Sequence, residues 1–223
     1  MTFSILATDG LGTFGMAVAS SSPAVAARCI HLRPGVGGVA SQNITNPDLG
    51  TQLLDLLEAG RSASEALDTT MDSLPNAEYR QIMVLDTHAR TSHFSGKQIL
   101  GVYNSAESPG SIAAGNLLRT AEVPQAMVDA FQGTSGELET RLLRGLQAGL
   151  QVGGETGPVH SAGLATVRSV PWRDTDLRVD WAERAPIAQL ADLVERWLPQ
   201  RDAYVTRAID PASAPSYGVP GDD

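Results

Sequence analysis

Apolar and polar positions alternate along the first part of the chain, and this alternation predicts β-strands. The strands are expected over Thr2–Thr8, Phe14–Ser20 and Val36–Ser41. Asp9-Gly10 follows the first strand and is typical of a hairpin turn. A hairpin brings the end of the second strand beside the start of the first.

Helical periodicity begins after the third strand. Leucines at helical spacing predict a helix from Leu49 to a C-cap at Gly60. Ser62-Ala63-Ser64-Glu65 is a capping box that begins a second helix, which ends before Pro75. The later elements are predicted in this order: strands at 81–86 and 90–95, a polar loop near 104–110, a short strand at 111–114, helices at 125–131 and 137–152 (the latter with Thr134 and Glu137 as its capping box), strands at 161–167 and 177–183, and a helix at 186–198.

This order of elements favours an α+β fold. Strands, a helical pair, strands, a second helical pair and strands build antiparallel sheets covered by segregated helices, rather than a parallel sheet of βαβ units. The pattern shows neither an internal repeat nor a linker, so a single domain is expected over residues 1–207. Residues 208–223 are rich in Pro, Gly and Ser and are expected to form a flexible tail.

Composition narrows the class of protein. The 223 residues are 42% hydrophobic, enough for a sizeable core. A net charge of −9, with Lys97 the only lysine, argues against nucleic acid as a partner. Cys29 is the single cysteine, so no intrachain disulfide is possible and a reducing compartment is expected. Neither a secretory signal nor a membrane-spanning run is found, so a cytoplasmic location without a membrane partner is expected.

Thr2 is the candidate catalytic residue. An initiator methionine is readily removed before threonine, which would leave Thr2 with a free α-amine and a hydroxyl. The amine has a pKa of roughly 7.7–8.0. It can therefore act as the general base for the hydroxyl of its own residue, which becomes an activated nucleophile.

Several polar side chains are expected to surround Thr2. The serines at the end of the second strand come within its reach through the hairpin. A polar run over 41–47 also follows a strand. Asn46 and Asp48 suit a turn and a helix N-cap, whereas Gln42 and Asn43 fit a capping role and an active-site role equally well. The residues expected to position the substrate or the oxyanion are Ser20, Ser21, Gln42, Asn43 and Asn116. Glu155 and His160 flank a strand start, and the pattern leaves their role open.

Two other kinds of site are not expected. The segment 10–15 fits the G-x-G-x-x-G dinucleotide fingerprint, but a strand follows it where the fingerprint needs a helix. No cofactor is therefore predicted. The four histidines occur in no metal-binding motif, and no Cys-x-x-Cys is present, so no metal is predicted either.

Several segments together resemble a known family. They are Thr2-Phe3-Ser4-Ile5, Gly15-Met16-Ala17-Val18-Ala19-Ser20, residues 35–42, Glu58-Ala59-Gly60, Glu65-Ala66-Leu67, residues 114–118, and Gly153-Gly154-Glu155 leading to Ser161-Ala162. Over roughly residues 2–200 the chain is similar to a bacterial family of unassigned function that is grouped with the N-terminal nucleophile (Ntn) hydrolases.

The resemblance implies a four-layer αββα sandwich of two antiparallel sheets between helical layers. It implies that Thr2 occupies the place of the nucleophile and that an amide is hydrolysed through an acyl-enzyme. The proteasome-like branch also keeps a lysine near the nucleophile. Here Lys97 lies in a late hairpin. Arg28 or Arg33 could supply positive charge but not proton transfer, and Arg28 is the candidate for electrostatic support. His160 stands where the family pattern has glutamine.

Three hypotheses follow. The first is a hydrolase of a small non-peptidic amide with Thr2 as the nucleophile. The second is a catalytically silent scaffold that binds a small molecule or a partner, which the missing lysine and the presence of Met1 favour. The third is a hydrolase that uses a serine from Ser20 to Ser22. A homodimer is expected under each of them.

Overall fold

The computed structural model describes residues 1–218, and two antiparallel sheets form its centre. The larger sheet contains six strands in the order β10-β9-β2-β1-β8-β7, and the smaller contains four in the order β3-β4-β5-β6. The strands are β1 (Thr2–Thr8), β2 (Phe14–Ser20), β3 (Ile30–Arg33), β4 (Gly37–Asn43), β5 (Arg80–Asp86), β6 (Thr91–Ser95), β7 (Val102–Ser108), β8 (Ser111–Leu118), β9 (Ser161–Val167) and β10 (Thr175–Val179).

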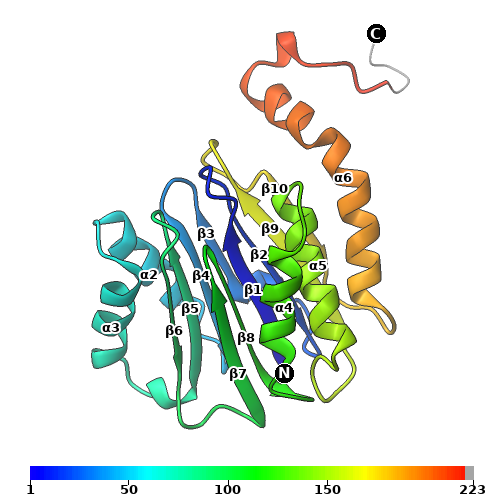
Figure 1. Ribbon diagram of the computed structural model, residues 1–223. Helices are drawn as coiled ribbons and strands as arrows, with labels where there is room; N and C mark the ends of the chain where they lie inside the picture. The colour runs from blue at the N-terminus through cyan, green and yellow to red at the C-terminus, as the bar shows by residue number, and fades with distance from the viewer. Residues whose placement is uncertain (219–223) are drawn as a thin grey trace.

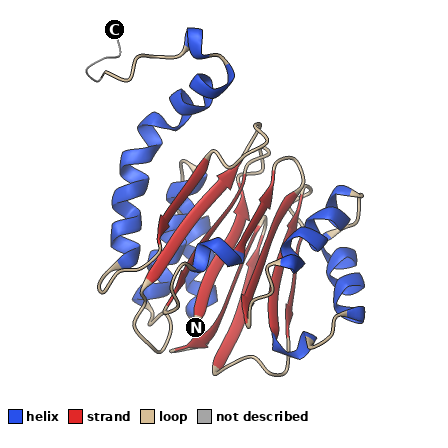
Figure 2. Ribbon diagram, turned by 180° about the vertical axis from the view of Figure 1, so that it is seen from behind, coloured by secondary structure: helices blue, strands red, loops and turns tan. Residues whose placement is uncertain are grey.

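Within residues 1–218, five helices cover the outer faces of the sheets, as Figure 1 shows: α2 (Asp48–Glu58), α3 (Ala63–Ser73), α4 (Val123–Gln132), α5 (Leu138–Gln151) and α6 (Pro186–Ile209). A short helix, α1 (Val25–Cys29), instead packs in the core between the two sheets. Helices α2 and α3 pack on the smaller sheet, and α4, α5 and α6 pack on the larger one. Seen from behind, the two sheets lie between these helical layers (Figure 2). The predicted αββα sandwich is confirmed.

Alternation along β1 decides which side chains face which layer. Phe3 and Ile5 pack among the helices of the larger sheet, whereas Leu6 packs in the core between the sheets. Thr2 and Ser4 share the parity of Leu6, so the strand directs them between the sheets. The Thr2 side chain is therefore directed between the two sheets of the sandwich.

The predicted hairpin of β1 and β2, which brings the end of β2 beside the start of β1, is confirmed. Phe3 pairs with Ala19, and Thr8 pairs with Phe14. The glycines of the 10–15 segment form the turn and the start of β2, as the strand pattern indicated. The capping box at Ser62 is also confirmed, because its hydroxyl accepts the Glu65 N–H while the Glu65 carboxylate accepts the Ser62 N–H.

Several predicted elements are corrected. The segment near 104–110, expected to be a loop, is mostly strand β7. This strand lies at the edge of the larger sheet, and its polar side chains do not alternate with apolar ones as those of a half-buried strand do. The last strand covers 175–179 instead of 177–183. The capping box at Thr134 does not form, because the Thr134 hydroxyl donates to the Ala130 carbonyl and α5 begins at Leu138.

Helix α6 continues past Pro199 to Ile209, beyond the end expected at 198. A proline inside a helix removes a backbone hydrogen bond and commonly kinks or ends the helix. Arg201 lies beyond this proline and is buried, with Nη1 2.9 Å from the Glu139 carboxylate of α5. This buried ion pair fixes the helix past the proline. The predicted tail thus begins inside α6, and its residues 219–223 lie outside the described residues.

The short helix α1 was not predicted, and it positions the loop that follows β2. Its Ala26 packs directly on Gly163 of β9, where an added Cβ would overlap the Ala26 methyl group.

We expect Gly163→Ala to lower the free energy of unfolding by about 1–3 kcal/mol through overpacking. Urea denaturation of the single variants and of the Gly163→Ala, Ala26→Gly double variant checks this. The double variant should lose less free energy of unfolding than the two single variants lose in total. A loss equal to that total would contradict the contact between Ala26 and Gly163.

Candidate active site

Thr2 lies at the start of β1, between two neighbouring strands. It pairs with Asn116 of β8, while Phe3 next to it pairs with Ala19 of β2. The Thr2 side chain is only 6% exposed. Figure 1 marks the N-terminus at one end of the larger sheet, below α4.

Two hydroxyls converge on the Met1 carbonyl. The Thr2 Oγ1 donates to the Met1 carbonyl oxygen at 2.6 Å, and the Ser20 hydroxyl donates to the same oxygen. The two hydroxyl oxygens lie 3.4 Å apart. The Ser22 N–H in turn donates to the Ser20 Oγ at 3.1 Å, which orients it. The reach of the serines to Thr2, predicted from the hairpin, is confirmed for Ser20.

A buried chain of amide side chains lies beside this pair. The Ser4 hydroxyl donates to Gln42 Oε1 at 2.6 Å, and Gln42 Nε2 donates to Gln81 Oε1 at 2.9 Å. Asn116 Nδ2 donates to the same Gln81 oxygen at 3.0 Å. These four side chains are fully buried. The Asn116 Oδ1 has no hydrogen-bond partner in residues 1–218 and is an open acceptor.

Gln81 is the member of this network that the sequence did not reveal. The sequence predicts it as the first residue of a strand over 81–86, and its parity along that strand indicates its role. Gln81 shares the strand face of Met83 and Leu85, which pack between the sheets. A lone amide on an otherwise apolar buried face indicates a hydrogen-bonded polar cluster.

Asn43 has a different environment from Gln42. It adopts a left-handed conformation with φ 69° at the end of β4. Its Nδ2 donates to the Tyr79 carbonyl at 2.8 Å, and its Oδ1 accepts the Leu100 N–H at 3.3 Å. Its amide is thus engaged in joining two loops, while Gln42 joins the buried network.

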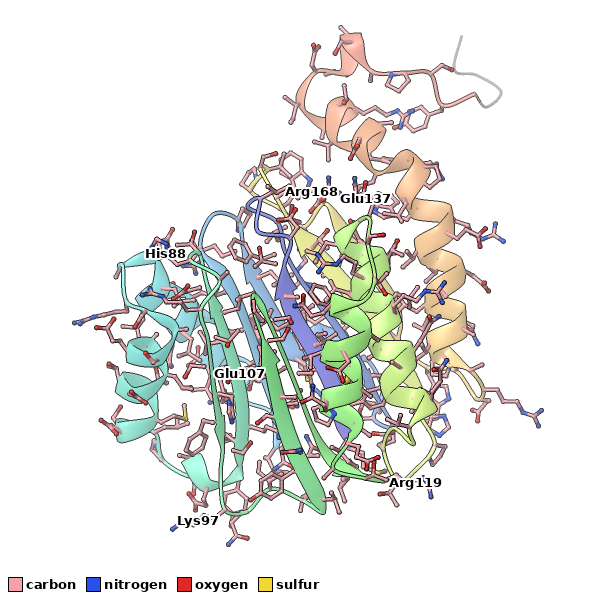
Figure 3. The ribbon with its side chains drawn as sticks, in the orientation of Figure 1. His88, Lys97, Glu107, Arg119, Glu137 and Arg168 are labelled. Carbon is pink, nitrogen blue, oxygen red and sulfur yellow. The ribbon has the colours of Figure 1, made fainter. Side chains whose placement is uncertain are left out.

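Neither Arg28 nor Lys97 forms a hydrogen bond with Thr2 within residues 1–218. Arg28 Nη1 donates to the carbonyls of Pro23 and Ala24, at 2.6 and 3.0 Å, within its own loop. Lys97 is exposed in the segment between β6 and β7 (Figure 3). The arrangement around Thr2 is therefore built from hydroxyls and amides.

Glu155 is a buried carboxyl group near the N-terminus. Glu155 is 2% exposed, and its backbone forms an isolated β-bridge with Leu118. Its two carboxyl oxygens have no well-formed hydrogen bond within residues 1–218. Burial raises the pKa of Glu155 to about 7, and the nearby Met1 ammonium and Ser21 oppose this rise. Ser21 thus lies beside Glu155, while Ser20 lies beside Thr2.

The raised pKa of Glu155 predicts a pH-dependent loss of stability. In the unfolded chain the carboxyl ionises near its ordinary pKa, roughly 4.3, whereas in the folded protein it holds its proton to about pH 7. The folded state therefore loses stability, relative to the unfolded state, as pH rises between these values. In urea unfolding, the wild-type protein should have a lower free energy of unfolding at pH 8 than at pH 5, and Glu155→Gln should lack this decrease. Equal pH dependence in the two proteins would contradict this assignment.

His160 supports the backbone around Ser20. Its N–H donates to the Ser20 carbonyl at 2.9 Å, and its Nδ1 lies 2.9 Å from the Ala182 carbonyl oxygen. Its ring stacks on Trp181 with centroids 4.2 Å apart. These contacts assign His160 to holding the loop.

A cavity of about 530 Å³ opens next to Glu155. It lies between the end of α5, the start of α6 and the segment that leads to β9. Its lining includes Arg119, Leu150, Glu155, Gly157, Val159 and Ile187. Figure 3 shows Arg119 at the end of the molecule where the N-terminus lies. Within residues 1–218, no group of three or more His, Cys, Asp or Glu side chains is arranged to hold a metal ion.

The comparisons with known proteins agree with this geometry at the level of the family. A family model described as a family of unknown function, DUF1028, matches residues 2–190. The chain belongs to the DUF1028 family. The likeness to a family of unassigned function is thereby confirmed, and the match places β1 with Thr2 at the first residues of the family region.

Solved structures similar to this DUF1028 protein include a crystal structure from Silicibacter pomeroyi assigned to the same family. The identity is 27%, the TM-score is 0.82, and 88% of each chain is covered. Anbu (ancestral beta-subunit) from Yersinia bercovieri is 10% identical, with a TM-score of 0.38 and coverage of 92% of this chain and 97% of that one. A search of curated protein sequences found no significant match. In residues 1–218, no helix is both long enough and apolar enough to cross a membrane.

Proposed function

We propose that this DUF1028 protein is an Ntn-type hydrolase of a small non-peptidic amide, with Thr2 as its nucleophile after removal of Met1. The observation that carries the proposal is the convergence of the Thr2 and Ser20 hydroxyls on one carbonyl oxygen at the start of β1. Such a pair supplies a nucleophile and a donor at one reacting carbonyl group.

The chemistry follows from these positions. The free α-amine of Thr2 takes the proton from Oγ1 as that oxygen attacks the substrate's carbonyl carbon. The Ser20 hydroxyl donates to the oxyanion that forms. The α-ammonium then protonates the leaving amine as the C–N bond breaks, which leaves an ester on Thr2. A water molecule, deprotonated by the same amine, hydrolyses that ester and restores the hydroxyl.

The amide network explains how Thr2 is held without a lysine. Asn116 pairs with Thr2 in the sheet and is fixed from the opposite sheet by Gln81. Its open Oδ1 is a ready acceptor for an ammonium or a water. Gln81 in the smaller sheet thus supports the start of β1 through hydrogen bonds, and no ion pair is needed for this support.

A second function, a silent scaffold that binds small molecules, is favoured by one observation. Thr2 is only 6% exposed, and its hydroxyl is engaged by the Met1 carbonyl. A nucleophile needs access to its substrate, and a scaffold does not. The same experiment separates the two functions.

The experiment is covalent trapping with a β-lactone, which acylates activated threonine hydroxyls. We expect a single adduct, mapped to Thr2 by peptide mass spectrometry, on protein whose Met1 has been removed. Thr2→Ala should carry no adduct, while Thr69→Ala, which removes an exposed helical threonine, should label like wild type. Labelling at Ser20 to Ser22, or no labelling of folded protein lacking Met1, would overturn the proposal.

A further inference from the structure

We infer that the acyl part of the substrate carries a free α-amino group bound by Glu155, so that the substrate is an α-amino acid amide. The inference rests on the proposed function and names its substrate class. Three observations carry it: the contacts of Met1, the isolation of Glu155 and the shape of the adjoining cavity.

Met1 occupies the space next to the nucleophile in the way an acyl group would. Its carbonyl oxygen accepts the hydroxyls of Thr2 and Ser20. Its side chain lies against Gly157, where an added Cβ would come within 2.7 Å of the Met1 Cε and 3.2 Å of its Sδ. Removal of Met1 empties this space, and an α-aminoacyl group has the same parts in the same order.

Glu155 lies where the α-amino group of such a substrate would be. Its carboxyl group is buried, and within residues 1–218 only the Ser21 hydroxyl and N–H approach it, without forming a well-aligned hydrogen bond. Such burial is costly unless a ligand supplies a donor. The Met1 ammonium lowers the pKa of this carboxyl through space, and the two groups form no ion pair within residues 1–218. A small substrate free to shift toward Glu155 can complete the pair.

The arginines of the cavity do not neutralise Glu155. Arg119 Nη2 donates to the Thr156 carbonyl at 3.2 Å, and Arg144 Nη1 donates to Gln147 Oε1 at 3.1 Å. Both line the same cavity as Glu155, but within residues 1–218 their guanidinium groups donate to Thr156 and Gln147 and not to Glu155. The carboxylate is therefore available to a cation brought by a ligand.

The cavity accounts for the side chain of the substrate. Gly157, which contacts the Met1 side chain, also lines the cavity of about 530 Å³. Leu150, Val159 and Ile187 contribute apolar lining beyond it. A cavity of this kind accepts an extended apolar side chain of the size of methionine or larger.

The test compares L-methionine p-nitroanilide with its N-acetyl derivative and with the 4-(methylthio)butanoyl anilide, which lacks the amine. Protein confirmed to lack Met1 is used. We expect kcat/KM to be roughly 10- to 100-fold higher for the free amine, because a hydrogen-bonded charge pair is lost with the other two. Glu155→Gln should abolish this preference. Glu137→Gln, a change in a carboxylate at the opposite end of the molecule, should keep it (Figure 3).

The outcomes separate the inference from the proposed function. Equal turnover of the three anilides by wild type, or an unchanged preference in Glu155→Gln, overturns the inference and leaves the Thr2 hydrolase standing. Turnover of none of the anilides, together with no β-lactone adduct on Thr2, overturns the proposed function itself. Turnover of none with a β-lactone adduct on Thr2 overturns the inferred substrate class alone. Because the first comparison needs only wild-type protein, misfolding of a variant does not weaken it.

Discussion

Thr2→Ala is expected to lower kcat/KM for a hydrolysed amide by about 10⁴-fold or more, because the attacking oxygen is lost. Thr2→Ser keeps a primary hydroxyl in the same position and should retain activity within about tenfold of wild type. The measurement is the initial rate of anilide hydrolysis with each protein, after mass spectrometry has shown that Met1 is absent from all of them.

Stability measurements provide the control for this prediction. The Thr2 hydroxyl forms hydrogen bonds with the Met1 carbonyl and the Ser20 hydroxyl. Its removal should therefore change the free energy of unfolding by no more than about 1 kcal/mol. Turnover by a folded Thr2→Ala variant within tenfold of wild type would contradict the role of Thr2.

Gln81→Leu is expected to lower the free energy of unfolding by about 3 kcal/mol or more. Gln81 accepts from Gln42 and Asn116, and its Nε2 donates to the Gly115 carbonyl at 3.1 Å. Leucine removes these partners and leaves buried donors and an acceptor without hydrogen bonds, each of which costs roughly 1–3 kcal/mol. Urea denaturation followed by circular dichroism measures the loss.

The matched control is an exposed glutamine. Within residues 1–218 the exposed Gln125 side chain forms a hydrogen bond only with Asp129 of its own helix, so Gln125→Ala should change the free energy of unfolding by no more than about 0.5 kcal/mol. A loss of less than about 1 kcal/mol in Gln81→Leu would show that the network between the sheets is not a cooperative support of β1.

The elements with strong local signals could be predicted from the sequence. The β1–β2 hairpin has alternation and a turn dipeptide, and α3 has its capping box, so both were found with nearly correct boundaries. Strand β7 was missed because an exposed edge strand needs no apolar face. The end of α6 was missed because Arg201, which fixes the helix beyond Pro199, pairs with residues far away in the sequence.

The candidate site was predictable in part for the same reason. Ser20 was placed near Thr2 by the hairpin, a local relation. The amide network depends on contacts between two sheets. The parity of Gln81 on its strand indicates a buried polar cluster but not its partners, and the local pattern does not distinguish Asn43 from Gln42. The isolation of Glu155 also depends on tertiary packing, since a carboxylate on a loop is ordinarily solvated.

The intact mass of the protein, produced without an N-terminal tag, tests the central claim most directly. The claim requires Thr2 to be the first residue, because only then is its amine free to act as the base. We predict a mass that is short by one methionine residue. The full mass, with Met1 retained on folded and homogeneous protein, would contradict the Thr2 mechanism and favour the binding scaffold.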